Sequence, residues 1–421
     1  MRSNKPSTGL IVVSAIITAT LLVTGTYAVA QQETVLLSFN GIVGGSGPLD
    51  GLIFDAVGNL YGTTNQGGAY APNSGGTVFQ LTPKPGGGWT ENVIHSFGAT
   101  GDGTFPSAGL VVDASGNLYG TTPTGGAYNS GTVFELKPTT SGWTELILHD
   151  FNNNGSDGYN PSAGLIFDNS GNLYGTTRFG GPYTCGVNSC GTVFELTPQP
   201  DGRWTEKILH NFGQTTTDGY QPLAGLIFDA AGNLYGTTYF GGTFLEGTVF
   251  ELTRRPNGTW LERIPHHFNA NGHDGFNPAA GLILDGAGNL YGTTYQGGTN
   301  LGTVFELTPK TTVGWTETIL HTFGNKAGTD GFNPVSGLVL DSAGNLYGTT
   351  PVGGANNVGI VFKLTPAAGS WTETVLHTFS ANGTDGYNSY AGLVSDSSGN
   401  LYGTTNIGGT VSDGTVFEIT P

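Results

Sequence analysis

Short apolar runs alternate with polar, glycine-rich stretches along this chain, and the same order of runs returns many times. The unit from Gly164 to Phe212 contains four such runs, GLIFD, NLYGTT, GTVFELTP and RWTEKILHNF. Each run is short, rich in Val, Ile, Leu, Phe, Tyr and Thr, and bounded by Gly, Pro, Asn or Asp, which is typical of β-strands joined by tight turns. We call these expected strands a, b, c and d in chain order. Nothing in the repeated region has the periodicity of an amphipathic helix.

The heptapeptide GNLYGTT marks the repeat. The repeat unit is about 56 residues long, and periods of this size indicate propellers or solenoids. Because four antiparallel strands joined by hairpins form one propeller blade, we predict an all-β, seven-bladed β-propeller with four antiparallel strands per blade. An open solenoid, which needs distinct capping units at its ends, and a pair of sandwich domains are the alternatives. Successive copies start 55 to 61 residues apart, at Gly58, Gly116, Gly171, Gly232, Gly288, Gly344 and Gly399.

The two ends of the repeated region complement each other. The last unit stops at GTVFEITP, residues 414–421, without a strand d. At the other end QQETVLLSF, residues 31–39, aligns without a gap on strand d of the first unit, WTENVIHSF, residues 89–97. We therefore expect residues 31–39 to form the outer strand of the last blade, pairing with residues 414–420 and closing the ring.

An Asp-x-x-Gly-Asn segment joins strand a to strand b in every unit. Gly171 suits the left-handed position after a type I turn, and the Asp side chain caps the free N–H groups of such a turn. We therefore interpret these acids as turn-formers rather than catalytic groups. The glycine of LYGTT is expected to let adjacent blades approach closely. The seven acids are Asp55, Asp113, Asp168, Asp229, Asp285, Asp341 and Asp396.

The first thirty residues differ from the rest. Arg2 and Lys5 precede an apolar run that ends in Ala28-Val29-Ala30, so residues 1–30 are predicted to be a secretory signal peptide cleaved before Gln31. An uncleaved membrane anchor is the alternative, since the run is nearly long enough to span a bilayer. Residues 31–421 form the single predicted domain, with no later membrane span. We expect the protein to be secreted, periplasmic or at the cell surface.

Composition and charge narrow the function classes. Only 10% of residues are charged while aromatics reach 11%, which is typical of a folded chain. The net charge is −17, which disfavours nucleic acid or an anionic membrane as partner. Two cysteines, Cys185 and Cys190, are predicted to form a disulfide within one loop, because an exported protein meets oxidising conditions. A metal site at these cysteines would need further ligands, and no histidine is nearby.

The repeat resembles a known family. GLIFDAAGNLYGTT, followed by GTVFELTP, is similar to the Gloeobacter/Verrucomicrobia tandem repeat of exported bacterial proteins described as choice-of-anchor, and more loosely to NHL-type propeller repeats. The first resemblance covers residues 31–421 and implies export and a propeller-like repeat, with no established activity. Members often end in a surface anchor, whereas this chain ends in EITP, so we do not expect anchoring here.

Candidate ligand-binding residues lie in the d-to-a loops, which share one face of the predicted disc with the b-to-c loops. Five of these loops carry an Asp-Gly-Tyr/Phe motif. Aromatic rings that stack on sugars beside hydroxyl-binding carboxylates would make a glycan site, and clustered carboxylates would suit Ca²⁺, although the Asp-x-Asp-x-Asp spacing is missing. For the motif itself we favour the structural interpretation, a turn tied down over the blade, because a binding site seldom needs the same residues six times. The candidates are Asp157, Tyr159, Asp218, Tyr220, Asp274, Phe276, Asp330, Phe332, Asp385, Tyr387 and, before the blade 3 loop, Arg178.

Six histidines recur in a His-x-Phe motif at the end of strand d. They fall on the same alternating face as apolar residues of their strand, which favours packed, hydrogen-bonded histidines over metal or acid–base roles. Departures from the repeat, namely the longer b-to-c loops of blades 1 and 3 and the extra His267 and His273, contain no nucleophile–base pair or metal triad. The repeated histidines are His95, His149, His210, His266, His321 and His377.

The sequence therefore predicts a monomeric, exported propeller that binds or scaffolds, with a glycan or a cell-surface protein as partner. No cofactor or metal is expected, apart from the calcium considered above. The alternative is a polysaccharide hydrolase or lyase that uses carboxylates of the Asp-Gly loops as acid and base, which requires a pair at glycosidase spacing.

Overall fold

The computed structural model describes residues 32–70, 75–298, 301–311, 314–326 and 328–420. The predicted signal peptide and Gln31 lie outside these residues. In the part that is described, no helix has the length and apolar character needed to cross a membrane. Residues Gln31–Pro421 make up one compact unit.

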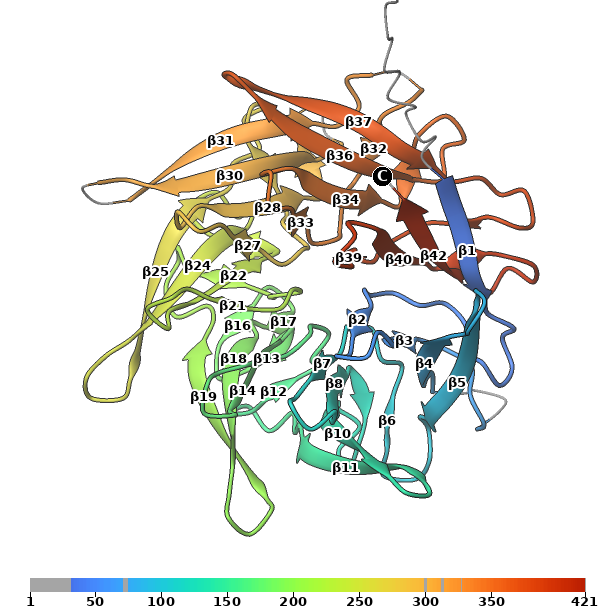
Figure 1. Cartoon of the computed structure of the whole chain (residues 1–421). Helices are drawn as coiled ribbons and strands as arrows, with labels where there is room; N and C mark the ends of the chain where they lie inside the picture. Colours follow the sequence, from blue (N-terminus) through green and yellow to red (C-terminus); the bar gives the residue numbers. More distant parts are fainter. Residues whose placement is uncertain (1–31, 71–74, 299–300, 312–313, 327, 421) are drawn as a thin grey trace, which may run out of the picture. The chain divides into compact units, whose positions relative to one another are not determined.

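Seven four-stranded antiparallel sheets follow one another around a ring, which confirms the predicted seven-bladed propeller (Figure 1). From the inner to the outer strand, blade 1 contains β2 (Ile53–Phe54), β3 (Leu60–Thr64), β4 (Thr77–Pro83) and β5 (Trp89–Ser96). Blade 2 contains β7 (Val111–Val112), β8 (Leu118–Thr122), β10 (Thr132–Thr139) and β11 (Gly142–Asp150). Blade 3 contains β13 (Ile166–Phe167), β14 (Leu173–Thr177), β18 (Thr192–Pro198) and β19 (Trp204–Asn211).

The remaining blades repeat this order. Blade 4 contains β21 (Ile227–Phe228), β22 (Leu234–Thr238), β24 (Thr248–Arg254) and β25 (Trp260–His267). Blade 5 contains β27 (Ile283–Leu284), β28 (Leu290–Thr294), β30 (Thr303–Pro309) and β31 (Trp315–Thr322). Blade 6 contains β33 (Val339–Leu340), β34 (Leu346–Thr350), β36 (Ile360–Ala367) and β37 (Ser370–Thr378). Blade 7 contains β39 (Val394–Ser395), β40 (Leu401–Thr405), β42 (Thr415–Thr420) and β1 (Gln32–Ser38).

Strand β1 closes the ring as predicted. It runs antiparallel to β42, with Gln32 opposite Thr420 and Ser38 opposite Thr415. In Figure 1 the blue β1 lies beside the red β42, so the two ends of the described chain share one sheet. Every other outer strand follows its neighbour through a hairpin, whereas this one comes from the opposite end of the sequence.

The a-to-b turns have the predicted construction. Asp168 Oδ1 accepts the N–H groups of Ser170 and Asn172 at 2.8 and 2.9 Å, and its Oδ2 accepts the side chains of Asn172 and Tyr174. Gly171 has a φ of 83°. The acids of this motif are therefore turn-formers, and their hydrogen-bonding capacity is used within their own hairpin.

The hydrophobic core consists of layers between adjacent blades. One layer joins Tyr61 and Val78 of blade 1 to Leu118 and Phe134 of blade 2. Phe97, which directly follows β5, packs edge-on against Phe134 with ring centroids 5.0 Å apart. Because each sheet buries both faces, small and apolar residues dominate and charges are scarce.

The glycine of LYGTT has a different role from the one expected. A Cβ on Gly62 would lie 2.6 Å from Phe79 Cζ and 2.8 Å from Leu52 Cδ2, both in the same blade. The missing side chain therefore makes room for the phenylalanine of the neighbouring strand, not for an adjacent blade. The prediction of close approach between blades was wrong.

Candidate functional site

The Asp-Gly-aromatic motif ties two loops of one blade together. Gly158–Tyr159 (β12) pairs with Phe179–Gly180 (β15), which joins the d-to-a connection to the b-to-c segment. The Tyr159 and Phe179 rings lie 5.5 Å apart. Five further two-residue pairs have the same construction: β6 (Gly103–Thr104) with β9 (Thr124–Gly125), β20 (Gly219–Tyr220) with β23 (Phe240–Gly241), β26 (Gly275–Phe276) with β29 (Gln296–Gly297), β32 (Gly331–Phe332) with β35 (Val352–Gly353), and β38 (Gly386–Tyr387) with β41 (Ile407–Gly408).

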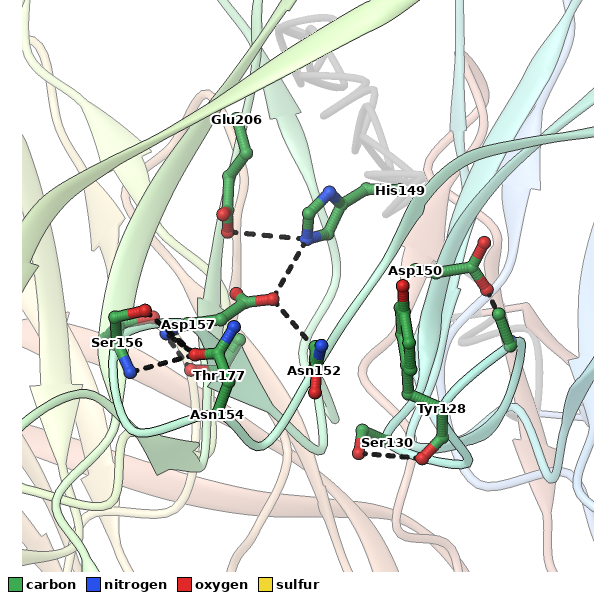
Figure 2. A network of polar contacts seen from close by, with 12 residues as sticks. Tyr128, Ser130, His149, Asp150, Asn152, Asn154, Ser156, Asp157, Thr177 and Glu206 are labelled. Carbon is green, nitrogen blue, oxygen red and sulfur yellow. Dashed lines mark hydrogen bonds and ion pairs between the residues drawn. The ribbon is translucent and has the colours of Figure 1, made fainter.

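The acid of the motif faces a histidine and a glutamate. His149 Nε2 lies 3.5 Å from Asp157 Oδ2 and 3.7 Å from Glu206 Oε1, and both contacts are drawn in Figure 2. His149 lies on the outer strand of blade 2, Asp157 in the connection to blade 3, and Glu206 on the outer strand of blade 3. Asp157 Oδ2 also accepts the N–H of Asn152 at 2.8 Å. Each such group, which we call a junction cluster, thus links two adjacent blades.

Six junction clusters are present among the described residues. The seventh junction, between blades 7 and 1, keeps the glutamate as Glu91 but has Leu37 where the alignment of β1 would place histidine. Glu91 Oε1 is buried there without a hydrogen-bond partner. The six clusters are His95–Asp102–Glu145, His149–Asp157–Glu206, His210–Asp218–Glu262, His266–Asp274–Glu317, His321–Asp330–Glu373 and His377–Asp385–Glu33.

Burial and like charge shape the electrostatics of these clusters. Burial, reinforced by the charge of the neighbouring aspartate, raises the pKa of Glu145 to about 8 and that of Glu262 and Glu317 to about 9. For Glu206, burial also dominates, but the charge of His149 opposes it and the pKa rises only to about 7. Two carboxyl groups packed together at one junction therefore resist simultaneous ionisation.

The predicted ligand-binding residues are distributed over five separate junctions instead of converging on one pocket. Four of the acids are buried and the fifth, Asp157, is half-buried, each beside its own histidine and glutamate. The aromatic residues of the motif are half-buried. Arg178 lies over the Phe179 ring at 4.9 Å. The motif thus has a structural role wherever it occurs, and a surface ligand would have limited access to its carboxylates.

The repeated histidines are packed as expected, but only four of the six make the expected hydrogen bond at Nε2. All six repeated histidines are buried or half-buried, and each packs against the phenylalanine two residues later, as His95 does against Phe97 with ring centroids 4.5 Å apart. The extra histidines do not form a site with them. His267 Nδ1 accepts the N–H of Thr243, and His273 is exposed.

The disulfide prediction is also confirmed. Cys185 and Cys190 are bonded across a small hairpin formed by β16 (Thr184–Cys185) and β17 (Asn188–Ser189) in the long blade 3 loop. This bridge holds the loop on the face that carries the d-to-a connections.

An arrangement that the sequence analysis missed lies on the same face. The position two residues after the Gly-Gly of each b-to-c loop is aromatic in blades 1 to 4 and Asn, Asn and Val in blades 5 to 7. The four aromatic side chains are exposed, at 48% for Tyr70, 58% for Tyr128, 39% for Tyr183 and 48% for Phe244. We call them the aromatic arc. The signal was readable as Gly-Gly-x-aromatic in consecutive repeats.

Two cavities lie elsewhere. A cavity of about 670 Å³ opens at the hairpin turns between blades 2 and 3, on the opposite face, and is lined among others by Trp204, Lys137 and Arg203. A smaller one of about 150 Å³ lies where the inner ends of the blades meet, beside Asp50. Asp50 occupies a position that holds Ala or Ser in the other six units. Neither cavity was predicted from the sequence.

Comparisons with known proteins agree with this architecture. The family described as Gloeobacter/Verrucomicrobia repeat matches residues 23–227, 72–285 and 261–421. No curated protein matches the chain. Among solved structures, the extracellular domain of a hybrid two-component system from Bacteroides thetaiotaomicron is 13% identical with a TM-score of 0.53, covering 92% of this chain and 39% of that one.

Two further structures are similar at lower scores. A candidate 6-phosphogluconolactonase from Bacteroides uniformis is 15% identical with a TM-score of 0.48, covering 77% of this chain and 83% of that one. A protein of unknown function from Dyadobacter fermentans is 10% identical with a TM-score of 0.46, covering 93% and 100%. At these identities the likeness concerns the fold alone.

Proposed function

The chain belongs to the Gloeobacter/Verrucomicrobia repeat family, and from that premise we propose that it is an exported binding module that holds a neutral extracellular glycan on the aromatic arc. The observation that carries the proposal is the exposure of Tyr70, Tyr128, Tyr183 and Phe244 at one repeat position in four consecutive blades. Large exposed aromatic side chains on a rigid scaffold are typical of binding surfaces.

The chemistry of the arc suits a sugar chain. Aromatic rings offer flat apolar faces to the C–H surfaces of sugars, and tyrosine adds a hydroxyl group at the rim. Successive blades present these rings in order around the disc, so an extended polymer would meet several of them at once. The net charge of −17 disfavours acidic polysaccharides, which leaves neutral ones as the expected class.

A hydrolase or lyase is the less favoured role. Its acid and base would face a shared groove at a spacing of about 5 to 10 Å. The Asp-Gly carboxylates instead pack against histidine and glutamate at separate junctions. Binding without bond cleavage therefore agrees better with the geometry.

A glycan array of neutral and acidic polysaccharides, followed by calorimetry on the strongest ligand, tests the proposal. Replacing Tyr128 and Tyr183 together by Ala should weaken binding about 10-fold or more while leaving the melting temperature unchanged, because stacking contacts contribute about 0.5–1.5 kcal/mol each. Val411→Ala is the matched control, since Val411 is exposed at the same position of blade 7. Tyr159→Ala should instead lower the melting temperature, because its ring packs on Phe179.

Three outcomes would contradict the proposal. The first is a folded protein that binds no glycan on a broad array, which would leave a protein partner. The second is equal weakening by Val411→Ala and by the double variant. The third is loss of glycan binding in a double variant, Lys137→Ala with Arg203→Ala, that keeps the aromatic arc. That result would indicate that the binding site is the cavity between blades 2 and 3.

A further inference from the structure

The junction between blades 3 and 4 holds three buried polar atoms without hydrogen-bond partners. His210 Nε2 lies 3.5 Å from Asp218 Oδ2 and 3.4 Å from Glu262 Oε1. His210 Nε2, Asp218 Oδ1 and Glu262 Oε1 are each buried and lack a hydrogen-bond partner. The side chains of His210 and Asp218 are 8% and 1% exposed, so solvent does not readily satisfy these atoms. A buried polar atom left without a partner is costly.

The junction between blades 2 and 3 has the same property. His149 Nε2, Asp157 Oδ1 and Glu206 Oε1 are again buried without hydrogen-bond partners. In Figure 2 the free oxygen of Asp157 points to the side of Glu206, so the unsatisfied atoms are directed into the cluster. The other four clusters also contain buried carboxylate oxygens without partners, and differ in that the histidine makes a 3.3 Å hydrogen bond with its aspartate.

We propose that the clusters His210–Asp218–Glu262 and His149–Asp157–Glu206 bind a divalent transition-metal ion of the Zn²⁺ class. A proton shared between the two carboxyl groups would satisfy the aspartate and the glutamate but would leave histidine Nε2 without a partner. A divalent ion takes one atom from each residue, and its charge balances two carboxylates beside a neutral imidazole.

The distances in both clusters are compatible with a bound ion. Charge-assisted hydrogen bonds between nitrogen and carboxylate are about 2.7–2.9 Å long, shorter than the 3.4–3.7 Å found in both clusters. Ligand atoms about 2.0–2.1 Å from a tetrahedral zinc ion are separated by about 3.3 Å. Three protein ligands leave one position for water, and the bound ion would hold the outer strands of adjacent blades together.

Zinc titration of the chelator-treated mature protein tests this inference. We expect about two bound equivalents by calorimetry and elemental analysis, a rise of several degrees in melting temperature, and visible absorption bands when Co²⁺ replaces Zn²⁺. Glu262→Gln should remove one equivalent, because the amide is a poor ligand. The same amide can still donate a hydrogen bond to Asp218, so the metal-free variant should fold as the parent does.

The seventh junction provides the control. At this junction Leu37 stands where the other junctions have a histidine beside the glutamate. Glu91→Gln should therefore leave the number of bound zinc ions and the cobalt spectrum unchanged. The inference is overturned if the parent takes up no zinc, or if Glu262→Gln retains both equivalents. It is also overturned if Glu91→Gln loses as much metal as Glu262→Gln. None of these outcomes depends on glycan binding.

Discussion

Individual residues matter most in this molecule where a side chain would not fit. Gly175, the central glycine of LYGTT in blade 3, lies opposite Phe194, and an added Cβ would be 2.6 Å from Phe194 Cζ and 2.9 Å from Leu165 Cδ2. Neither ring nor methyl group can move far in a closely packed layer. The same glycine recurs in every blade because the same phenylalanine does.

We predict that Gly175→Ala destabilises the protein by about 1–3 kcal/mol through this overpacking. Gly286→Ala is the control, because a Cβ there meets nothing within 4 Å and several other blades already carry Ala at that position. Chemical denaturation of both variants checks the prediction. Equal stability of the two variants would show that Phe194 has room to shift.

Asp50 is a second residue-scale case, because it breaks the repeat at the inner end of blade 1. Its carboxylate accepts the N–H groups of Gly51 and Gly109, both at 2.6 Å. Burial raises the pKa of Asp50, and these two hydrogen bonds oppose only part of that shift. A folded-state pKa above the unfolded one means that the ionised form is disfavoured in the fold.

We therefore expect Asp50→Ala to raise the melting temperature at pH 7. Because wild type regains stability as pH falls through the folded-state pKa, the advantage of the variant should shrink toward pH 4 and below. Melting curves across this range measure the effect, with Ala108→Ser, at the equivalent place in blade 2, as a control for altered packing. A variant that is less stable at pH 7 would show that the two hydrogen bonds outweigh the burial of the charge.

At the scale of elements, β1 is the strand on which closure depends. It covers the edge of β42, and Leu36 and Leu37 pack on the layer between blades 7 and 1. Without β1, the backbone groups of β42 would form an open sheet edge, which favours pairing between molecules.

Deletion of residues 32–38 should lower the melting temperature by about 10 °C or more and promote aggregation. Scanning calorimetry with light scattering measures both effects. A peptide spanning residues 32–39, added in trans, should restore part of the loss, since it supplies the missing strand. A truncated protein that melts as the parent does would mean that β1 contributes little to closure.

At the scale of the whole molecule, the ring has no intrinsic beginning. Gln32 of β1 lies opposite Thr420 of β42. In the other blades the residues at the same place, such as Pro198 and Trp204 of blade 3, also lie opposite each other but are joined by a hairpin turn. The packing of the blades alone therefore does not require that the ring be opened at this hairpin and not at another.

A circular permutant tests this view. We expect a chain that joins Thr420 to Gln32 through a Pro-Asp-Gly hairpin, and opens between Pro200 and Asp201 in the exposed c-to-d hairpin of blade 3, to keep its melting temperature within about 5 °C. Opening within β14, between Gly175 and Thr176, should prevent folding, because both residues are buried in the blade. If the first permutant fails to fold, the backbone pairing of β1 with β42 is not enough to make the hairpins of the ring equivalent.

Local chemistry in the sequence was enough to predict the blades, the a-to-b turns, the closing strand and the disulfide. Strand alternation, turn residues and cysteine spacing act over a few residues, and a tandem repeat presents each signal several times. The partners of the histidines were not predictable in this way. His210, Asp218 and Glu262 come from two blades and the loop between them, so only the packing of one blade on the next brought them together. Exposure of the aromatic arc was likewise decided by tertiary structure, because Tyr128 and Tyr159 have the same side chain, yet Tyr128 is exposed and Tyr159, which packs on Phe179, is half-buried.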